Sequence, residues 1–214
     1  MDDGRPRPPR AEELPLSEQP EPSDPTAEGL PTTAEAPPST AARPRTRLLL
    51  GLAAGVLVTD LVTKLVVVAT IEPGEDIRLL AGALYLTQLR NIGAAFSFAE
   101  GATVLFSLVA VVVSAVIVRT ARRLFSTGWA VALGLVLGGA LGNLIDRIFR
   151  DPGFLRGGVV DFLSVFGPDG QVWPVFNVAD SAIVCGAVLG AYLAVRGIEF
   201  DGSRPTDREV ADAA

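Results

Sequence analysis

The sequence contains no histidine, a single cysteine and a single lysine among its 214 residues. A Ser-His or Cys-His nucleophile needs an imidazole, and so does the His-Glu-x-x-His zinc motif, so both kinds of site are excluded. Cys185 lies in an apolar run, and one thiol allows neither an internal disulfide nor a thiolate metal cluster. Any hydrolytic chemistry must therefore use carboxylates, or Lys64.

Acidic charge is concentrated in the two ends of the chain. Residues 1–42 carry nine acids, three bases and 10 of the 16 prolines, and residues 197–214 carry five acids and two bases. Such segments bury too little apolar surface to offset the entropy of ordering, so we predict disordered tails. The middle, 43–196, has 13 bases and 10 acids, a balance that indicates no nucleic-acid surface.

Long apolar runs dominate the middle of the chain, which is typical of a membrane protein. We predict an all-α integral membrane protein with four transmembrane helices and a membrane domain over 43–196. The predicted spans are at about 48–69, 102–118, 129–146 and 176–195. Arginines cluster at 43–47, 119–123 and 196, which favours a cytoplasmic location for those helix ends and for both termini.

Polar side chains within or near these spans fall on the opposite, extracytoplasmic side in this topology. Asp60 and Lys64 are four residues apart on one helical face, which indicates a neutralised pair that fixes packing, a wall of a polar cavity, or both. Asn143, Asp146 and Arg147 share a face of the last turn of the third span. An ionisable group inside a membrane is a functional hypothesis by default.

Asp161 and Asp180 differ from Asp60 and Asp146 because no cation lies within four residues of either. Asp60 has Lys64 one turn away, and Asp146 has Arg147 beside it, so a nearby cation keeps each of those carboxylates ionised. Asp161 is in a polar loop before the fourth span, and Asp180 is one turn into that span. If they face each other near lipid, they would share a proton, and one could activate water while the other acts as acid. Asn177 could bond Asp180 or cap the helix. A solvated loop acid is the alternative for Asp161, and folding could bring Arg147 or Arg156 alongside.

Five motifs in this order resemble the bacterial lipoprotein signal peptidases, the type II signal peptidases, over residues 46–196. The motifs are Asp60-x-x-x-Lys64, Asn91-x-Gly93-Ala94-Ala95-Phe96, Gly142-Asn143-x-x-Asp146-Arg147, Val160-Asp161-Phe162 and Phe176-Asn177-x-Ala179-Asp180-Ser181.

The resemblance implies a membrane aspartic endopeptidase that removes the signal peptide of diacylglyceryl-modified prolipoproteins, cutting before the lipidated cysteine. It implies catalysis by Asp161 and Asp180 and no metal or cofactor. It also implies a small extracytoplasmic β-sheet, which suits the partly alternating residues 72–90. We expect a monomer in the bacterial cell membrane, with lipids and prolipoproteins as partners. The substrate-binding or supporting residues by the same match are Asp60, Lys64, Asn91, Gly93, Ala94, Gly142, Asn143, Asp146, Arg147, Asn177 and Ala179.

Two other classes of protein fit parts of the pattern. Buried acids also serve as ion relays in transporters, but those sites usually lie between broken helices at the membrane midplane. Here the spans are unbroken and the acids lie toward one side. A non-catalytic scaffold could use Asp60, Lys64 and the glycines of the third span, but it leaves Asp161 and Asn177 without a role.

Overall fold

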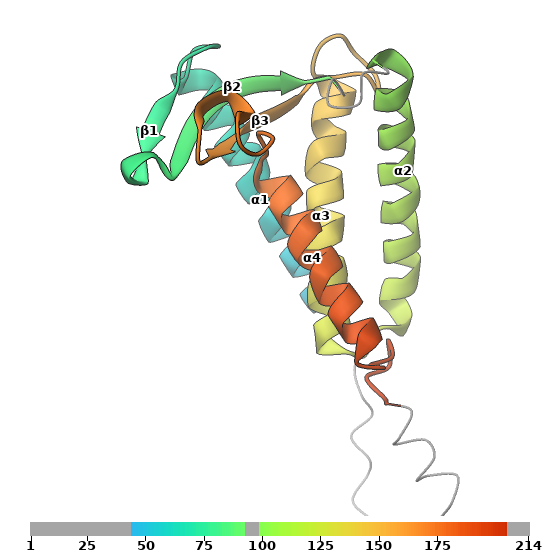
Figure 1. The fold of residues 1–214 in the computed structure, drawn as a ribbon. Coiled ribbons are helices and arrows are strands. Elements are labelled where there is room, and N and C mark those ends of the chain that lie inside the picture. The colour runs from blue at the N-terminus through green and yellow to red at the C-terminus, as the bar shows by residue number, and fades with distance from the viewer. Residues whose placement is uncertain (1–43, 93–98, 205–214) are drawn as a thin grey trace, which may run out of the picture. The chain divides into compact units, whose positions relative to one another are not determined.

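The computed structural model describes residues 44–92 and 99–204, and within them it has four long helices and a small sheet (Figure 1). Each of these helices is long and apolar enough to cross a membrane, which confirms the predicted architecture. The predicted tail over 1–42 lies outside the described residues. The helices are α1 Thr46–Thr70, α2 Ala99–Thr120, α3 Thr127–Phe149 and α4 Val178–Val195.

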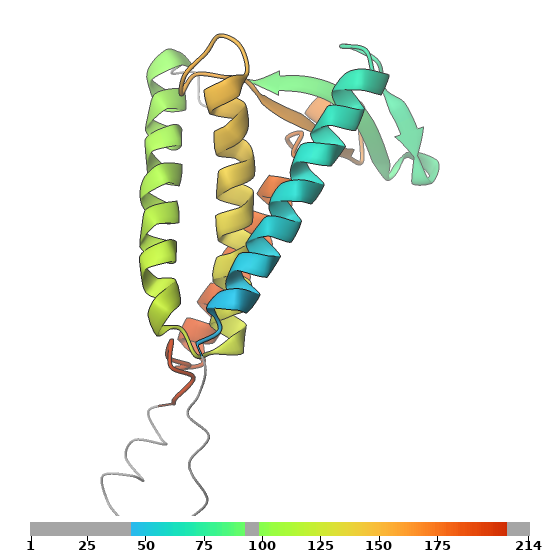
Figure 2. The same ribbon diagram turned by 180° about the vertical axis from the view of Figure 1, so that it is seen from behind.

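The sheet is antiparallel, in the order β1-β2-β3. Its strands are β1 Ile77–Leu79, β2 Leu84–Asn91 and β3 Val159–Val165. It lies beside the C-terminal end of α1 and the N-terminal end of α4 (Figures 1 and 2). The strand character of 77–89 was predicted, but placing Asp161 in a loop was wrong. The sequence Val-Val-Asp-Phe-Leu-Ser-Val is rich in β-branched and aromatic residues, and its backbone pairs with β2.

Small residues allow the helices to pack closely. Helix α3 contacts each of the other three helices among the described residues. A Cβ added at Gly138 would lie 2.6 Å from the Ala53 carbonyl oxygen of α1, and one at Gly186 of α4 would lie 2.6 Å from that of Ala132. Both distances are too short for a side chain. The glycine-bearing face of α3 therefore contacts neighbouring helices directly.

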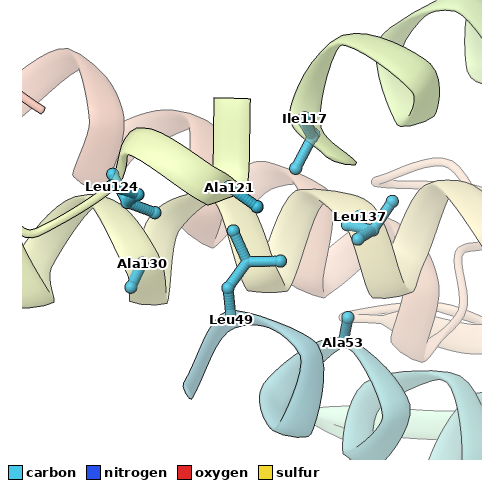
Figure 3. Close-up of a cluster of buried hydrophobic side chains, with 7 residues drawn as sticks. All are labelled: Leu49, Ala53, Ile117, Ala121, Leu124, Ala130 and Leu137. Atoms are coloured by element: carbon cyan, nitrogen blue, oxygen red, sulfur yellow. The ribbon is translucent and has the colours of Figure 1, made fainter. Parts of the chain in front are cut away.

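The end of the bundle away from the sheet contains an apolar cluster (Figure 3). We call it the arginine end because arginines lie at its helix ends. The cluster joins the start of α1 to the end of α2 and to α3 through Leu49, Ala53, Ile117, Ala121, Leu124, Ala130 and Leu137.

Residues 197–204 belong to this end as well. The Phe200 carbonyl accepts bonds from the N–H groups of Phe125 and Ser126, each at 2.9 Å. The ring of Phe200 packs on Trp129 with 4.6 Å between centroids. This differs from the prediction that a disordered tail begins at residue 197, because Phe200 finds an aromatic partner that sequence spacing does not indicate.

Candidate active site

Strand pairing positions Asp161. In the register of β2 and β3, Leu89 lies opposite Asp161 and Asn91 lies opposite Val159. The Asn91 side-chain amide donates to Asp161 Oδ2 at 2.9 Å. The Asp161 side chain is 1% exposed, so it is a buried carboxyl rather than the solvated loop acid of the alternative interpretation.

A helix cap positions Asp180. Asn177 is the N-cap of α4, and its Oδ1 accepts from the Asp180 N–H at 2.9 Å. In return Asp180 Oδ2 accepts from the Asn177 N–H at 3.1 Å, which completes a capping box. The carboxylate also lies in the first turn of the helix, where the partial positive charge of the N-terminus favours an anion. The cap predicted for Asn177 is confirmed.

Asn177 links the two aspartates. Besides capping Asp180, it donates through Nδ2 to Asp161 Oδ1 at 2.7 Å. Asn143 completes the link from α3, because its Nδ2 donates to Asp180 Oδ1 at 2.8 Å. Both oxygens of Asp161 and both oxygens of Asp180 therefore accept N–H donors. Three asparagine side chains hold the two carboxyls in fixed orientations.

Burial beside a second acid perturbs Asp161. Removal from water, and secondly the negative charge of Asp180, raise the pKa of the Asp161 carboxyl from 3.8 to a net value of about 7. The bonds from Asn91 and Asn177 oppose this shift without cancelling it. A carboxyl with a pKa near neutrality can hold a proton that its neighbour lacks.

A buried charge network contacts Asn143, one of the asparagines that position the two carboxyls. Lys64 Nζ lies 2.7 Å from Asp60 Oδ2 and 3.0 Å from Asp146 Oδ2, and all three side chains are at most 1% exposed. The predicted Asp60–Lys64 pair is thus confirmed. Lys64 also donates to Asn143 Oδ1 at 3.0 Å, which turns the amide nitrogen of Asn143 toward Asp180. The network therefore determines which end of that amide faces the candidate site.

Asp146 has partners that differ from the predicted one. We had paired it with the adjacent Arg147, but its other cation is Arg150, one turn further along α3. Its Oδ2 also accepts from the Val160 N–H at 3.2 Å, next to Asp161. Adjacent residues on a helix point about 100° apart, whereas residues four apart share a face. The i,i+4 spacing of Asp146 and Arg150 was the signal that could have identified this pair.

Arg147 instead lies within electrostatic range of Asp161 and Asp180. Its guanidinium interacts electrostatically with Asp161 and Asp180, but within the described part of the chain it is in ion-pair contact with neither. Its buried Nη1 has no hydrogen-bond partner there. A buried N–H donor without an acceptor is uncommon and is suited to receive a ligand oxygen.

Two further motif residues explain the close contact of α1, α3 and α4. The Ala179 N–H donates to Asp60 Oδ1 at 2.9 Å, so a charge on α1 holds the first turn of α4. A Cβ at Gly142 would lie 2.5 Å from Asp60 Oδ2, so only glycine leaves room for that carboxylate. Gly93 and Ala94 lie outside the described residues.

Comparison with known proteins identifies the family of this chain. The family model described as "Signal peptidase (SPase) II" matches residues 52–196. A lipoprotein signal peptidase of Rhodococcus jostii (strain RHA1) is 57% identical over 159 residues, 74% of this chain and 78% of the relative. One of Mycobacterium tuberculosis (strain ATCC 25618 / H37Rv) is 47% identical over 195 residues, 87% and 94% of the two chains.

A solved structure agrees as well. A bacterial membrane enzyme superposes with a TM-score of 0.60 at 30% identity, over 69% of this chain and 92% of the other. The family match covers more than half of the sequence, and the relatives align over most of their own length. The chain belongs to the signal peptidase II family of membrane peptidases.

Proposed function

We propose that this membrane peptidase removes the signal peptide from diacylglyceryl-modified prolipoproteins, cutting before the lipidated cysteine, and that Asp161 and Asp180 activate the attacking water. The observation that carries the proposal is the pair of carboxyls that Asn177 joins at the N-terminus of a membrane-spanning helix. Family membership supports the peptidase chemistry. A site at the end of a span suits a peptide bond just outside the lipid.

The two carboxyls divide the chemistry between them. Asp161, with its pKa raised to about 7, is the carboxyl that holds the shared proton below that pH. Asp180 accepts a proton from water, whose oxygen attacks the scissile carbonyl carbon while Asp161 protonates the carbonyl oxygen. The tetrahedral gem-diol then collapses: one of its hydroxyls returns a proton to Asp161, the C–N bond breaks, and the proton on Asp180 passes to the leaving amine. Each aspartate thereby returns to the protonation state that it had at the start.

Arg147 is suited to stabilise the intermediate. The carbonyl oxygen gains negative character before it is protonated, and a preorganised cation near that position stabilises the charge. The unpartnered Nη1 of Arg147 provides such a donor beside the dyad. We assign Arg147 this role, and we assign positioning roles to Asn91, Asn143 and Asn177.

We also propose that the candidate site faces the extracytoplasmic side. Arg45, Arg47, Arg119 and Arg196 lie at helix ends or directly beside them, all at the arginine end of the bundle. An excess of arginine marks the cytoplasmic side of membrane proteins. This orientation puts both termini of the membrane domain in the cytoplasm and exposes the site to secreted precursors.

Purified full-length protein, incubated with a diacylglyceryl-modified prolipoprotein and separately with the unlipidated precursor, tests the proposal. We expect the modified precursor to yield a product whose first residue is the lipidated cysteine, and the unlipidated one to remain largely uncut. Equal cleavage of both precursors would refute the proposed substrate class. Absence of cleavage of either would refute the function.

A further inference from the structure

The arginine end contains a cleft that the proposed reaction does not use. The cleft lies between α2 and α3, on the far side of the bundle from the aspartates, and has a volume of about 980 Å³. Its mouth is formed by Arg119 at the end of α2 and by Arg122 and Arg123 in the following 3-10 turn η3 (Ala121–Arg123). Its inner wall includes Leu137 and Leu141 of α3. The cleft is therefore basic at one end and apolar along the rest.

One buried hydroxyl in this cleft lacks a partner. Ser114 lines the cleft and is 9% exposed, and within the described residues its Oγ makes no hydrogen bond. Serine in a helix commonly bonds the carbonyl one turn earlier, as Ser107 of the same helix does with the Thr103 carbonyl at 2.9 Å. A buried hydroxyl without a partner loses the bonds that water would supply. Ser114 is thus a donor directed at a space with no protein acceptor.

The arginines at the mouth carry uncompensated charge. Arg119, Arg122 and Arg123 are exposed, and in the described ranges none of them is in ion-pair contact with a carboxylate. No aspartate or glutamate lines the cleft. Three neighbouring cations at a membrane surface attract an anionic headgroup, and each contributes about 1 kcal/mol (about 5-fold) to its binding.

The cleft's arginines, its serine and its leucines lie at different depths along the helices. At 1.5 Å per residue, Ser114 lies about 9 Å inward from Thr120 at the end of α2. Leu137 and Leu141 lie about 15 and 21 Å inward from the start of α3 at Thr127. From the surface inward, the cleft thus has cations, then a hydroxyl donor, then an apolar wall. A phospholipid has its phosphate, ester carbonyl and acyl chain in the same order.

We propose that this cleft binds an anionic phospholipid. The arginines contact the phosphate, Ser114 donates to an ester carbonyl, and an acyl chain lies along Leu137 and Leu141. A soluble anion would leave the apolar wall and Ser114 unused. A zwitterionic lipid would bring its own cation toward three arginines. This inference does not depend on the proposed peptidase function, because its test measures binding alone.

Tryptophan fluorescence offers a direct test. The chain has two tryptophans, Trp129 and Trp173. Trp129 packs on Phe200, which lines the cleft, so a Trp173→Phe variant keeps a single tryptophan, next to the cleft. We would reconstitute this full-length variant in phosphatidylcholine bilayers. A small fraction of phosphatidylglycerol or of phosphatidylcholine would be brominated near the ester end of its acyl chains.

We expect brominated phosphatidylglycerol to quench Trp129 more strongly than brominated phosphatidylcholine does, with a local enrichment of about 5-fold for each arginine engaged. Replacing Arg119, Arg122 and Arg123 by glutamine should abolish the preference. Ser114→Ala should weaken binding by about 2- to 10-fold, the range of one hydrogen bond.

A second triple variant is the matched control. Replacing Arg45, Arg47 and Arg196 by glutamine removes the same charge from the same end of the bundle but leaves the cleft lining of α2 and η3 intact. This control should keep the preference. Equal quenching by the two lipids, or equal loss of preference in both triple variants, would overturn the proposal. Loss of the preference on adding inorganic phosphate would also overturn it, because the site would then bind the anion without the lipid.

Discussion

Replacing Asp161 by asparagine should make the fold less sensitive to pH. The pKa of this carboxyl is 3.8 when unperturbed and about 7 in the folded protein. Between these values the unfolded chain ionises at Asp161 while the folded chain keeps it protonated, so wild-type stability falls as pH rises toward 7. Asparagine has the same shape and does not titrate. The free energy of unfolding of the variant therefore does not decrease over this pH range for this reason.

The magnitude follows from the pH interval. From pH 5 to a folded pKa of about 7 the interval is about two units, and each unit corresponds to about 1.4 kcal/mol, so the wild type loses about 3 kcal/mol that the variant keeps. The asparagine also presents an NH2 group to the donor of Asn91 or Asn177. That clash costs about 1 to 3 kcal/mol, but it is the same at every pH and cancels from the comparison.

Thermal unfolding of the detergent-solubilised proteins at pH 5 and pH 8 measures the effect. Relative to wild type, the melting temperature of Asp161→Asn should rise by about 6 to 12 °C between the two pH values. Asp76→Asn, a change at an exposed residue just before β1, should show no such rise. A difference between Asp161→Asn and wild type that stays constant from pH 5 to pH 8 would refute the argument that Asp161 is protonated in the fold.

Three further predictions concern activity and packing. Cleavage should decline as pH rises through about 7, because the raised pKa keeps Asp161 protonated only below that value; a rate that continues to rise to pH 9 would contradict this. Gly142→Ala should destabilise the fold by about 1 to 3 kcal/mol in chemical denaturation, since its Cβ meets Asp60. Gly55→Ala, with nothing within 4 Å, should be tolerated. EDTA should leave cleavage unchanged, because the chemistry uses carboxylates; inhibition by EDTA would count against it.

Helix positions could be predicted from the sequence because membrane spans depend on local composition. A run of about 20 apolar residues is specified by its own side chains. The i,i+4 spacing that predicted the contact of Asp60 with Lys64 is local as well. So is the N-cap at Asn177, where a capping residue precedes an apolar run.

Contacts between distant segments could not be predicted in this way. Strand β3 was missed because Asp161 and the flanking glycines suggested a polar loop, and because its partner β2 lies about 70 residues away in the sequence. The position of Lys64 between Asp60 and Asp146 depends on the crossing of α1 and α3. Sequence neighbours alone suggested Arg147 for Asp146, whereas the ion-pair contact is made by Arg150, four residues further along the chain.

The most direct test of the account is cleavage of a diacylglyceryl-modified prolipoprotein in membranes by Asp161→Asn and Asp180→Asn. Asp76→Asn serves as a matched control. We predict that both dyad variants insert in the membrane and accumulate uncut lipid-modified precursor, while the control cuts as wild type does. Cleavage at the normal rate by either dyad variant would show that the substituted aspartate is not catalytic and would contradict the proposed mechanism.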